Sequence, residues 1–154
     1  MASKHGWAVG LAMGCLLALP AGAVDPVAIG VLKLVRGDVQ LMRGEQPLPA
    51  TVGTTVHVSD RLSTGDDGFV GITFDDNSLL SLGASGHLRI DRYDYNSTTH
   101  VGAFETTLSA GRLAVVGGNI ARETPDAMRL RTPYALLGVR DQAEFVVEAR
   151  VRQP

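Results

Sequence analysis

The feature that most restricts the fold of this chain is a regular alternation of residue types between Asp60 and Leu82. Apolar residues fall at every second position, and the residues between them are small or polar. Because successive side chains of a β-strand point to opposite faces, this period of two predicts half-buried strands. Clusters of Gly, Asp and Asn between the alternating runs supply the turns. We therefore expect these strands and the next one to build a core from Val70, Ile72, Phe74, Leu80, Leu82, Leu88 and Ile90.

Turn signals recur along the rest of the chain about every eight to twelve residues, and no long helical period follows the N-terminus. This spacing predicts a single compact all-β domain, with a sandwich, a barrel and a β-helix-like roll as the open alternatives. Hairpins are expected around Arg36–Asp38 and around Ser109–Gly111, and loops over Tyr93–Thr99 and Ala121–Ala127. Glu45–Ala50 contains two prolines, which cannot donate to a ladder, so it is expected to be a connection or a weak edge.

Residues 1–23 have the organisation of a secretory signal peptide. Lys4 supplies the charged start, an apolar run follows, and Ala21–Ala23 fits the small-residue rule for cleavage. Cleavage after Ala23 would leave residues 24–154 as an exported periplasmic domain without a transmembrane span. A retained membrane anchor and lipid attachment at Cys15 are the alternatives.

The charge and cysteine content restrict how this domain is stabilised and what it binds. Cys15 is the only cysteine, so the exported domain contains none and depends on its apolar core rather than on disulfides. Its charges are nearly balanced, because removing Lys4 from the 14 basic residues leaves 13 against 16 acidic ones. Nucleic-acid binding needs a concentrated basic surface, so we expect no nucleic-acid partner.

No group of residues predicts a catalytic, metal or cofactor site. Ser85 is not in a nucleophile elbow, because His87 stands where that motif needs glycine. The histidines of the exported domain lack the short spacing of zinc ligands. Asp66–Asp67 and Asp75–Asn77 offer oxygen atoms on turns but lack the alternating pattern of a calcium loop, which leaves calcium between them as an open alternative. We therefore expect a non-enzymatic domain without a cofactor.

Two motifs resemble the FecR domain family. The first is Gly-x6-Asp-x-Leu-x-Thr-Gly-x2-Gly, followed by Phe-Asp-Asp-Asn-Ser and Leu-x-Leu; the second is Thr-Pro followed by Gly-Val-Arg. The resemblance covers about Ile29–Ala149 and implies a compact, β-helix-like roll. The residues that carry it are Gly53, Asp60, Leu62, Thr64, Gly65, Gly68, Phe74, Asp76, Ser78, Leu80, Thr132, Pro133, Gly138, Val139 and Arg140.

The resemblance also implies a role in sensing at the cell envelope. A typical member joins a cytoplasmic anti-sigma segment and a membrane helix to this periplasmic domain, which interacts with an outer-membrane receptor. We expect the present chain to act without its own anti-sigma segment and to bind a periplasmic or outer-membrane protein, or another envelope component. The alternative is a structural or glycan-associated envelope domain. If Phe145–Val151 is an outermost strand, its free edge would accept a strand from a partner.

The segment after Gly-Val-Arg departs from the family, in which Gly-Thr follows. Here Asp141–Glu144 stands in that place and is about one residue longer. An extra residue inverts the facing of every later side chain in a strand unless a bulge or loop absorbs it. We expect such a bulge or short loop at Asp141–Ala143, which would direct Phe145 and Val147 toward the core.

Overall fold

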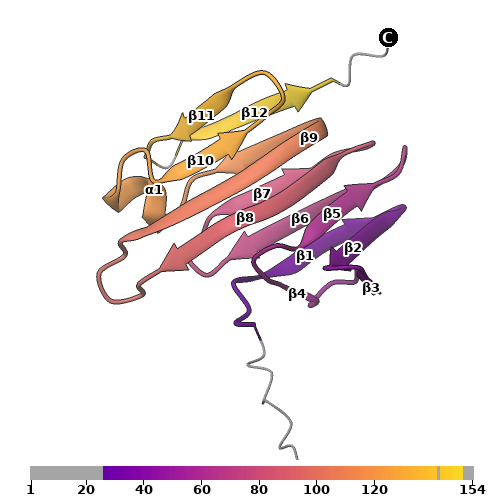
Figure 1. Cartoon of the computed structure of the whole chain (residues 1–154), viewed down its shortest axis with the longest axis horizontal. Helices are drawn as coiled ribbons and strands as arrows, with labels where there is room; N and C mark the ends of the chain where they lie inside the picture. Colours follow the sequence, from indigo (N-terminus) through magenta and orange to yellow (C-terminus); the bar gives the residue numbers. More distant parts are fainter. Residues whose placement is uncertain (1–25, 142, 151–154) are drawn as a thin grey trace, which may run out of the picture.

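The structure is a computed structural model that describes residues 26–141 and 143–150, so the expected signal peptide lies outside the described residues. The prediction of an all-β domain is confirmed, because strands dominate and form a curled, largely antiparallel sheet (Figure 1). The elements are β1 Gly30–Arg36, β2 Val39–Arg43, β3 Gln46–Leu48, β4 Thr55–Val56, β5 Arg61–Thr64, β6 Phe69–Phe74, β7 Leu79–Leu82, β8 His87–Tyr95, β9 Gly102–Val116, α1 Asn119–Glu123, β10 Met128–Arg131, β11 Leu136–Val139 and β12 Glu144–Ala149.

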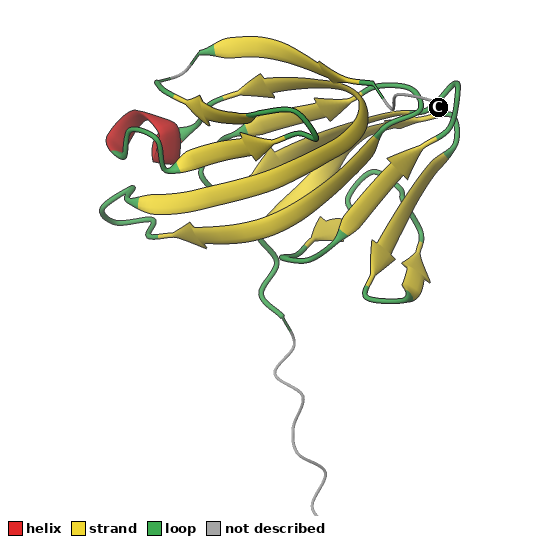
Figure 2. Ribbon diagram, turned by 45° about the horizontal axis from the view of Figure 1, so that its top comes forward, coloured by secondary structure: helices red, strands yellow, loops and turns green. Residues whose placement is uncertain are grey.

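Two layers share the longest strand, β9. Its first part pairs with β8 and with β10, and its last part, residues 111–116, pairs with β7 and with β12. One layer, sheet B, has the strand order β3-β2-β5-β8-β9-β10-β11; the other, sheet A, has the order β4-β1-β6-β7-β9-β12. The β9–β10 pair is parallel and the other pairs are antiparallel. Figure 2 shows the strands curving and the sheet curling over on itself.

The core lies between the two layers and is one continuous cluster. All seven residues that the alternation predicts to be in the core are at most 2% exposed, which confirms the predicted facing of these strands. Phe74 is central, since its ring centroid lies 4.6 Å from that of Phe104 and 5.7 Å from that of Tyr93. The core therefore combines the predicted residues with aromatic side chains from β8 and β9.

At one end of the molecule the chain passes between the layers at corners that lie next to one another. The corner after β5 contacts the corner after β1, because Gly65 N–H donates to the Asp38 carbonyl at 2.9 Å. It also contacts the corner after β7, because Ser85 N–H donates to the Gly65 carbonyl at 2.9 Å. The last corner is the bend of β9 at Gly111, where φ is +89° and a Cβ atom would lie 2.5 Å from Gly86 Cα. Only glycine fits this bend.

Both expected hairpins are wrong, and these corners explain why. β1 pairs with β4 and β6, whereas β2 pairs with β3 and β5, so the chain changes layer at Gly37 instead of folding back. Gly37 has a φ of +62°, and a Cβ there would lie 2.3 Å from the Asp67 carbonyl oxygen. Residues 102–116 form one strand, because the positive φ of Gly111 bends the strand without reversing it. In this part of the chain β2 instead forms a hairpin with the edge strand β3, within the segment expected to be a weak edge.

The two expected loops are shorter than predicted. β8 continues to Tyr95, and α1 occupies the first part of the segment Ala121–Ala127. The helix forms because the β6–β7 turn binds its first residues: Asn119 N–H donates to the Asp76 carbonyl at 2.7 Å. Within residues 26–141 and 143–150, no helix is long and apolar enough to cross a membrane.

The segment before β12 follows the predicted arrangement. Residues 140, 141 and 143 lie outside strands, and Asp141 has a φ of +62°, as in a turn. Phe145 and Val147 pack against the core, as expected. Gln142 itself lies outside the described residues.

Candidate functional site

Two family-motif residues, Asp76 and Ser78, form a buried polar network at the β6–β7 turn, and both are 0% exposed. The Asp76 carboxylate accepts hydrogen bonds from the Ser78 hydroxyl at 2.7 Å, the Tyr93 hydroxyl at 3.2 Å and Ile120 N–H at 3.3 Å. The Ser78 hydroxyl oxygen in turn accepts Gly118 N–H at 3.0 Å. Burial and the neighbouring carboxylate raise the pKa of Tyr93 far above its usual value. The network joins three elements that are distant in sequence: the β6–β7 turn, β8 and the start of α1.

A second group of motif residues fixes the corner between β5 and β6. The Thr64 hydroxyl donates to the Gly83 carbonyl at 2.6 Å and accepts Gly86 N–H at 2.8 Å, which connects this corner to the one after β7. A Cβ at Gly68 would lie 2.3 Å from the Asp38 carbonyl oxygen, and one at Gly65 would lie 3.0 Å from the Asp38 side chain. The corner therefore needs a hydroxyl and small residues for its packing.

The remaining motif residues of the first half also support the fold. Asp60 is 0% exposed and accepts two hydrogen bonds from the Arg43 guanidinium, each at 2.9 Å, and one from His57 N–H at 2.8 Å. Leu62, Phe74 and Leu80 belong to the core, and Gly53 occupies a turn with a φ of +93°.

The C-terminal motif joins β11 to the turn before β10. Arg140 binds the Asp126 carboxylate with two hydrogen bonds of 2.8 and 2.9 Å, which hold the pKa of Asp126 below its usual value. Gly138 leaves room for that carboxylate, since a Cβ would lie 2.9 Å from Asp126 Oδ1, and Val139 is buried. Thr132 caps the β10–β11 turn around Pro133 by accepting Ala135 N–H at 3.0 Å. The contacts of the motif residues thus build the fold rather than a reactive centre.

The described residues show no arrangement of side chains that fits the catalytic or the metal-binding alternatives. The Ser85 hydroxyl donates to Asp66 at 2.8 Å on an exposed corner, without a histidine base beside it. The two Asp-rich turns lie at opposite ends of β6, so one calcium ion cannot join Asp66 and Asp75. Across residues 26–141 and 143–150, no three His, Cys, Asp or Glu side chains come together as metal ligands would.

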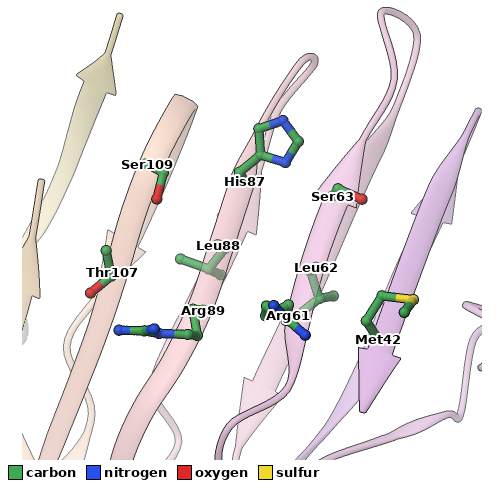
Figure 3. A pocket seen from close by; sticks show the side chains of 9 residues that line it. All are labelled: Met42, Arg61, Leu62, Ser63, His87, Leu88, Arg89, Thr107 and Ser109. Carbon is green, nitrogen blue, oxygen red and sulfur yellow. The ribbon is translucent and has the colours of Figure 1, made fainter. Parts of the chain in front are cut away.

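A depression of about 510 Å³ lies on the outer face of sheet B (Figure 3). Figure 3 shows Met42, Arg61, Arg89 and Thr107 side by side on four neighbouring strands, and the strand registers pair them in this order. The parallel β9–β10 register adds Arg131 beyond Thr107. We call Arg61, Arg89 and Arg131 the arginine row. Ser63, His87 and Ser109 line the same depression.

Arg61 and Arg89 are paired across the adjacent strands β5 and β8, and like charges at such positions by themselves destabilise a sheet. Thr107 separates Arg89 from Arg131. Arg89 offsets this destabilisation in part by pairing with Asp91 at 2.5 Å, but among the described residues Arg61 donates only to the Gly44 carbonyl, at 2.6 Å. The row therefore has cationic donors available for an anion on the protein surface. Sequence reasoning did not find it, because the arginines are widely spaced along the chain and meet only through the strand register.

The second candidate surface is the outer edge of β12. This strand pairs only with β9 within the described part of the chain, and it is the last strand of sheet A. The other outer strands are β3, which has three residues including Pro47, β4, which has two residues, and β11, which has four. β12, with six residues, is the longest edge, and edges of this kind accept an added strand.

The fold and these surfaces define a small all-β domain with two candidate binding surfaces. The sequence model of the FecR protein family matches residues 60–153, more than half of the 154 residues, and the chain belongs to this family. Neither the curated proteins nor the solved structures contain a match to the chain. Membership of the FecR family indicates a sensing or regulatory domain associated with the periplasm and envelope.

Proposed function

We propose that the chain is a non-enzymatic periplasmic sensing and interaction domain, which binds a periplasmic or outer-membrane protein. Family membership supports the sensing role. The signal-like residues 1–23 support export with cleavage after Ala23. The observation that carries the binding mode is the free edge of β12, to which a segment of the partner adds as a further strand of sheet A.

The geometry of β12 sets what this partner contributes. In an antiparallel pair, alternate residues direct N–H and C=O toward the neighbouring strand and the others direct them away. About half of the backbone groups of β12 therefore face outward, ready for main-chain hydrogen bonds. Tyr134 from the β10–β11 turn donates to the Arg150 carbonyl at 2.7 Å, so the far end of this edge is already covered. The partner strand is expected along Glu144–Glu148.

Proline variants of two adjacent residues test this binding mode. In Val146→Pro and Val147→Pro, one lost N–H belongs to the β9 ladder and the other to the free edge. The free-edge variant should have the melting temperature of the alanine variant of the same residue, because only its side-chain packing is lost, yet fail to capture the protein that the wild type retains from envelope extracts.

Val146→Ala and Val147→Ala are the matched controls, because they shorten the same side chains and keep both N–H groups. If the proline variant that melts like its alanine control still captures the same protein, the partner does not add to β12.

The arginine row favours a second candidate function, which is association with an anionic envelope polysaccharide. Carboxylate or phosphate groups on such a polymer would accept hydrogen bonds from Arg61, Arg89 and Arg131. Hydroxyl groups of Ser63 and Ser109, which line the same depression, fit the neutral parts of a sugar chain, whereas the Thr107 hydroxyl already donates to Asp91.

Binding to heparin, as an anionic probe, tests this candidate. Arg61→Ser combined with Arg89→Ser should weaken binding by about tenfold and reduce its salt dependence, because two charge-assisted contacts are removed. Arg112→Ser, on the outer face of sheet A, is the matched control and should bind as the wild type does. Equal binding by neutral dextran would contradict a role for the charges.

A further inference from the structure

The turn between β8 and β9 carries a modification motif. Asn96-Ser97-Thr98 fits Asn-x-Ser/Thr, the acceptor motif for sugars linked to asparagine on exported proteins. Asp94 stands two residues before Asn96, and its side chain is 62% exposed. It extends the motif to acid-x-Asn-x-Thr and offers a modifying enzyme an ionic contact.

The strand pairing places this motif at the exposed tip of a hairpin. Tyr95 of β8 pairs with Gly102 of β9, so residues 96–101 form the connection, which projects from one end of the molecule (Figure 1). Residues 96–99 are all exposed. An enzyme can therefore reach Asn96 after the domain has folded.

The Asn96 carboxamide is held by its oxygen, which leaves its nitrogen available. Asn96 Oδ1 accepts Thr98 N–H at 2.9 Å and Thr99 N–H at 3.0 Å, as in an Asx turn. Within the described part of the chain, neither Asn96 Nδ2 nor the Thr98 hydroxyl has a hydrogen-bond partner. A sugar on Nδ2 replaces one of its two hydrogen atoms and leaves Oδ1 unchanged, so the turn is compatible with the modification.

We propose that Asn96 is the acceptor site for an oligosaccharide, which a periplasmic oligosaccharyltransferase transfers from a lipid diphosphate donor. In this transfer Asn96 Nδ2 bonds to the anomeric carbon of the first sugar, and the bond from that carbon to the diphosphate oxygen breaks. The lipid diphosphate leaves with the bonding electrons, and the proton lost from Nδ2 passes to a base of the transferase. The site rests on the export proposed above, because the domain meets such a donor in the periplasm.

Mass spectrometry of the chain isolated from the envelope of its native host tests the site. The peptide that contains Asn96 should carry the mass of one oligosaccharide, and fragmentation should place this mass on Asn96. Asn96→Asp should lose the mass, because it keeps Oδ1 for the turn but removes Nδ2. Thr98→Ala should lose it as well, whereas Thr98→Ser should keep it, because the hydroxyl is retained.

Asn77 is the internal control. It is also exposed and lies in a turn, with a φ of +65°, but Leu79 stands where the motif needs a hydroxyl residue. Asn77 should therefore stay unmodified in the same sample. Thermal melts monitored by circular dichroism check that each variant is folded.

The N-terminus of the same sample separates the glycan site from the proposed export. An unmodified Asn96 in a chain that begins at Val24 would overturn the site and leave the export intact. A chain that keeps residues 1–23 and carries no glycan would contradict both. A sugar attached to Ser97 or Thr98 instead of Asn96 would also overturn the site.

Discussion

Replacing Phe74 with alanine is expected to lower the free energy of unfolding by about 3–5 kcal/mol, because a fully buried ring is lost and a cavity remains. Phe74 is 2% exposed, and its ring lies against Phe104 and Tyr93. β6, β8 and β9 each pair with strands on both sides, so they cannot move together to fill the space. A loss of this size is a large share of the stability of an ordinary domain.

Urea denaturation at a fixed protein concentration measures this loss. Phe69→Ala is the control, because Phe69 lies on the same strand but faces outward, and it should cost less than about 1 kcal/mol. A loss below about 1 kcal/mol for Phe74→Ala would contradict the central place of this ring in the core.

Replacing Asp76 with alanine is expected to have an effect of similar size, about 3–5 kcal/mol, although no large apolar group is removed. The carboxylate accepts hydrogen bonds from Ser78, Tyr93 and Ile120, and the site is 0% exposed. Without it these donors stay buried and unpaired, and an unpaired buried donor costs more than its hydrogen bond contributes.

Asp75→Ala is the matched control, since Asp75 is the exposed neighbour in the same turn, and it should change stability by less than about 0.5 kcal/mol. The loss of stability in Asp76→Asn should lie between the losses in Asp75→Ala and Asp76→Ala, because an amide oxygen retains part of the acceptor capacity. Equal melting temperatures for the two alanine variants would show that the Asp76 network does not stabilise the fold.

The facing of the central strands could be predicted from the sequence, because alternation is a local property of the chain. Val70, Ile72 and Phe74 share one parity, and the structure buries all three. The pairing of the strands could not be predicted in the same way. Gly37 and Gly111 carry the usual signal of a turn, but whether the chain then reverses, changes layer or only bends depends on Asp67 and Gly86, which are distant in sequence.

Only part of the candidate surfaces could be predicted from the sequence. The sequence offered the C-terminal strand as a free edge only on the condition that it lies outermost, and the strand pairing in the structure meets this condition. The arginine row needed the register between β5, β8, β9 and β10, which no local pattern encodes. Asp76 looked like an ordinary turn residue, since its buried donors Tyr93 and Ile120 follow much later in the chain.

The sharing of β9 by both layers has a kinetic consequence. Residues 102–116 supply the pairing partner of β7, β8, β10 and β12, so neither layer is complete before this segment arrives. Because synthesis starts at the N-terminus, β1 to β8 are made before β9. Part of their apolar surface stays exposed to water until β9 is available. Such non-local pairing costs the conformational entropy of closing long loops before the stabilising contacts form. We therefore expect β9 to belong to the folding nucleus, and we expect folding to be slow for a domain of this size.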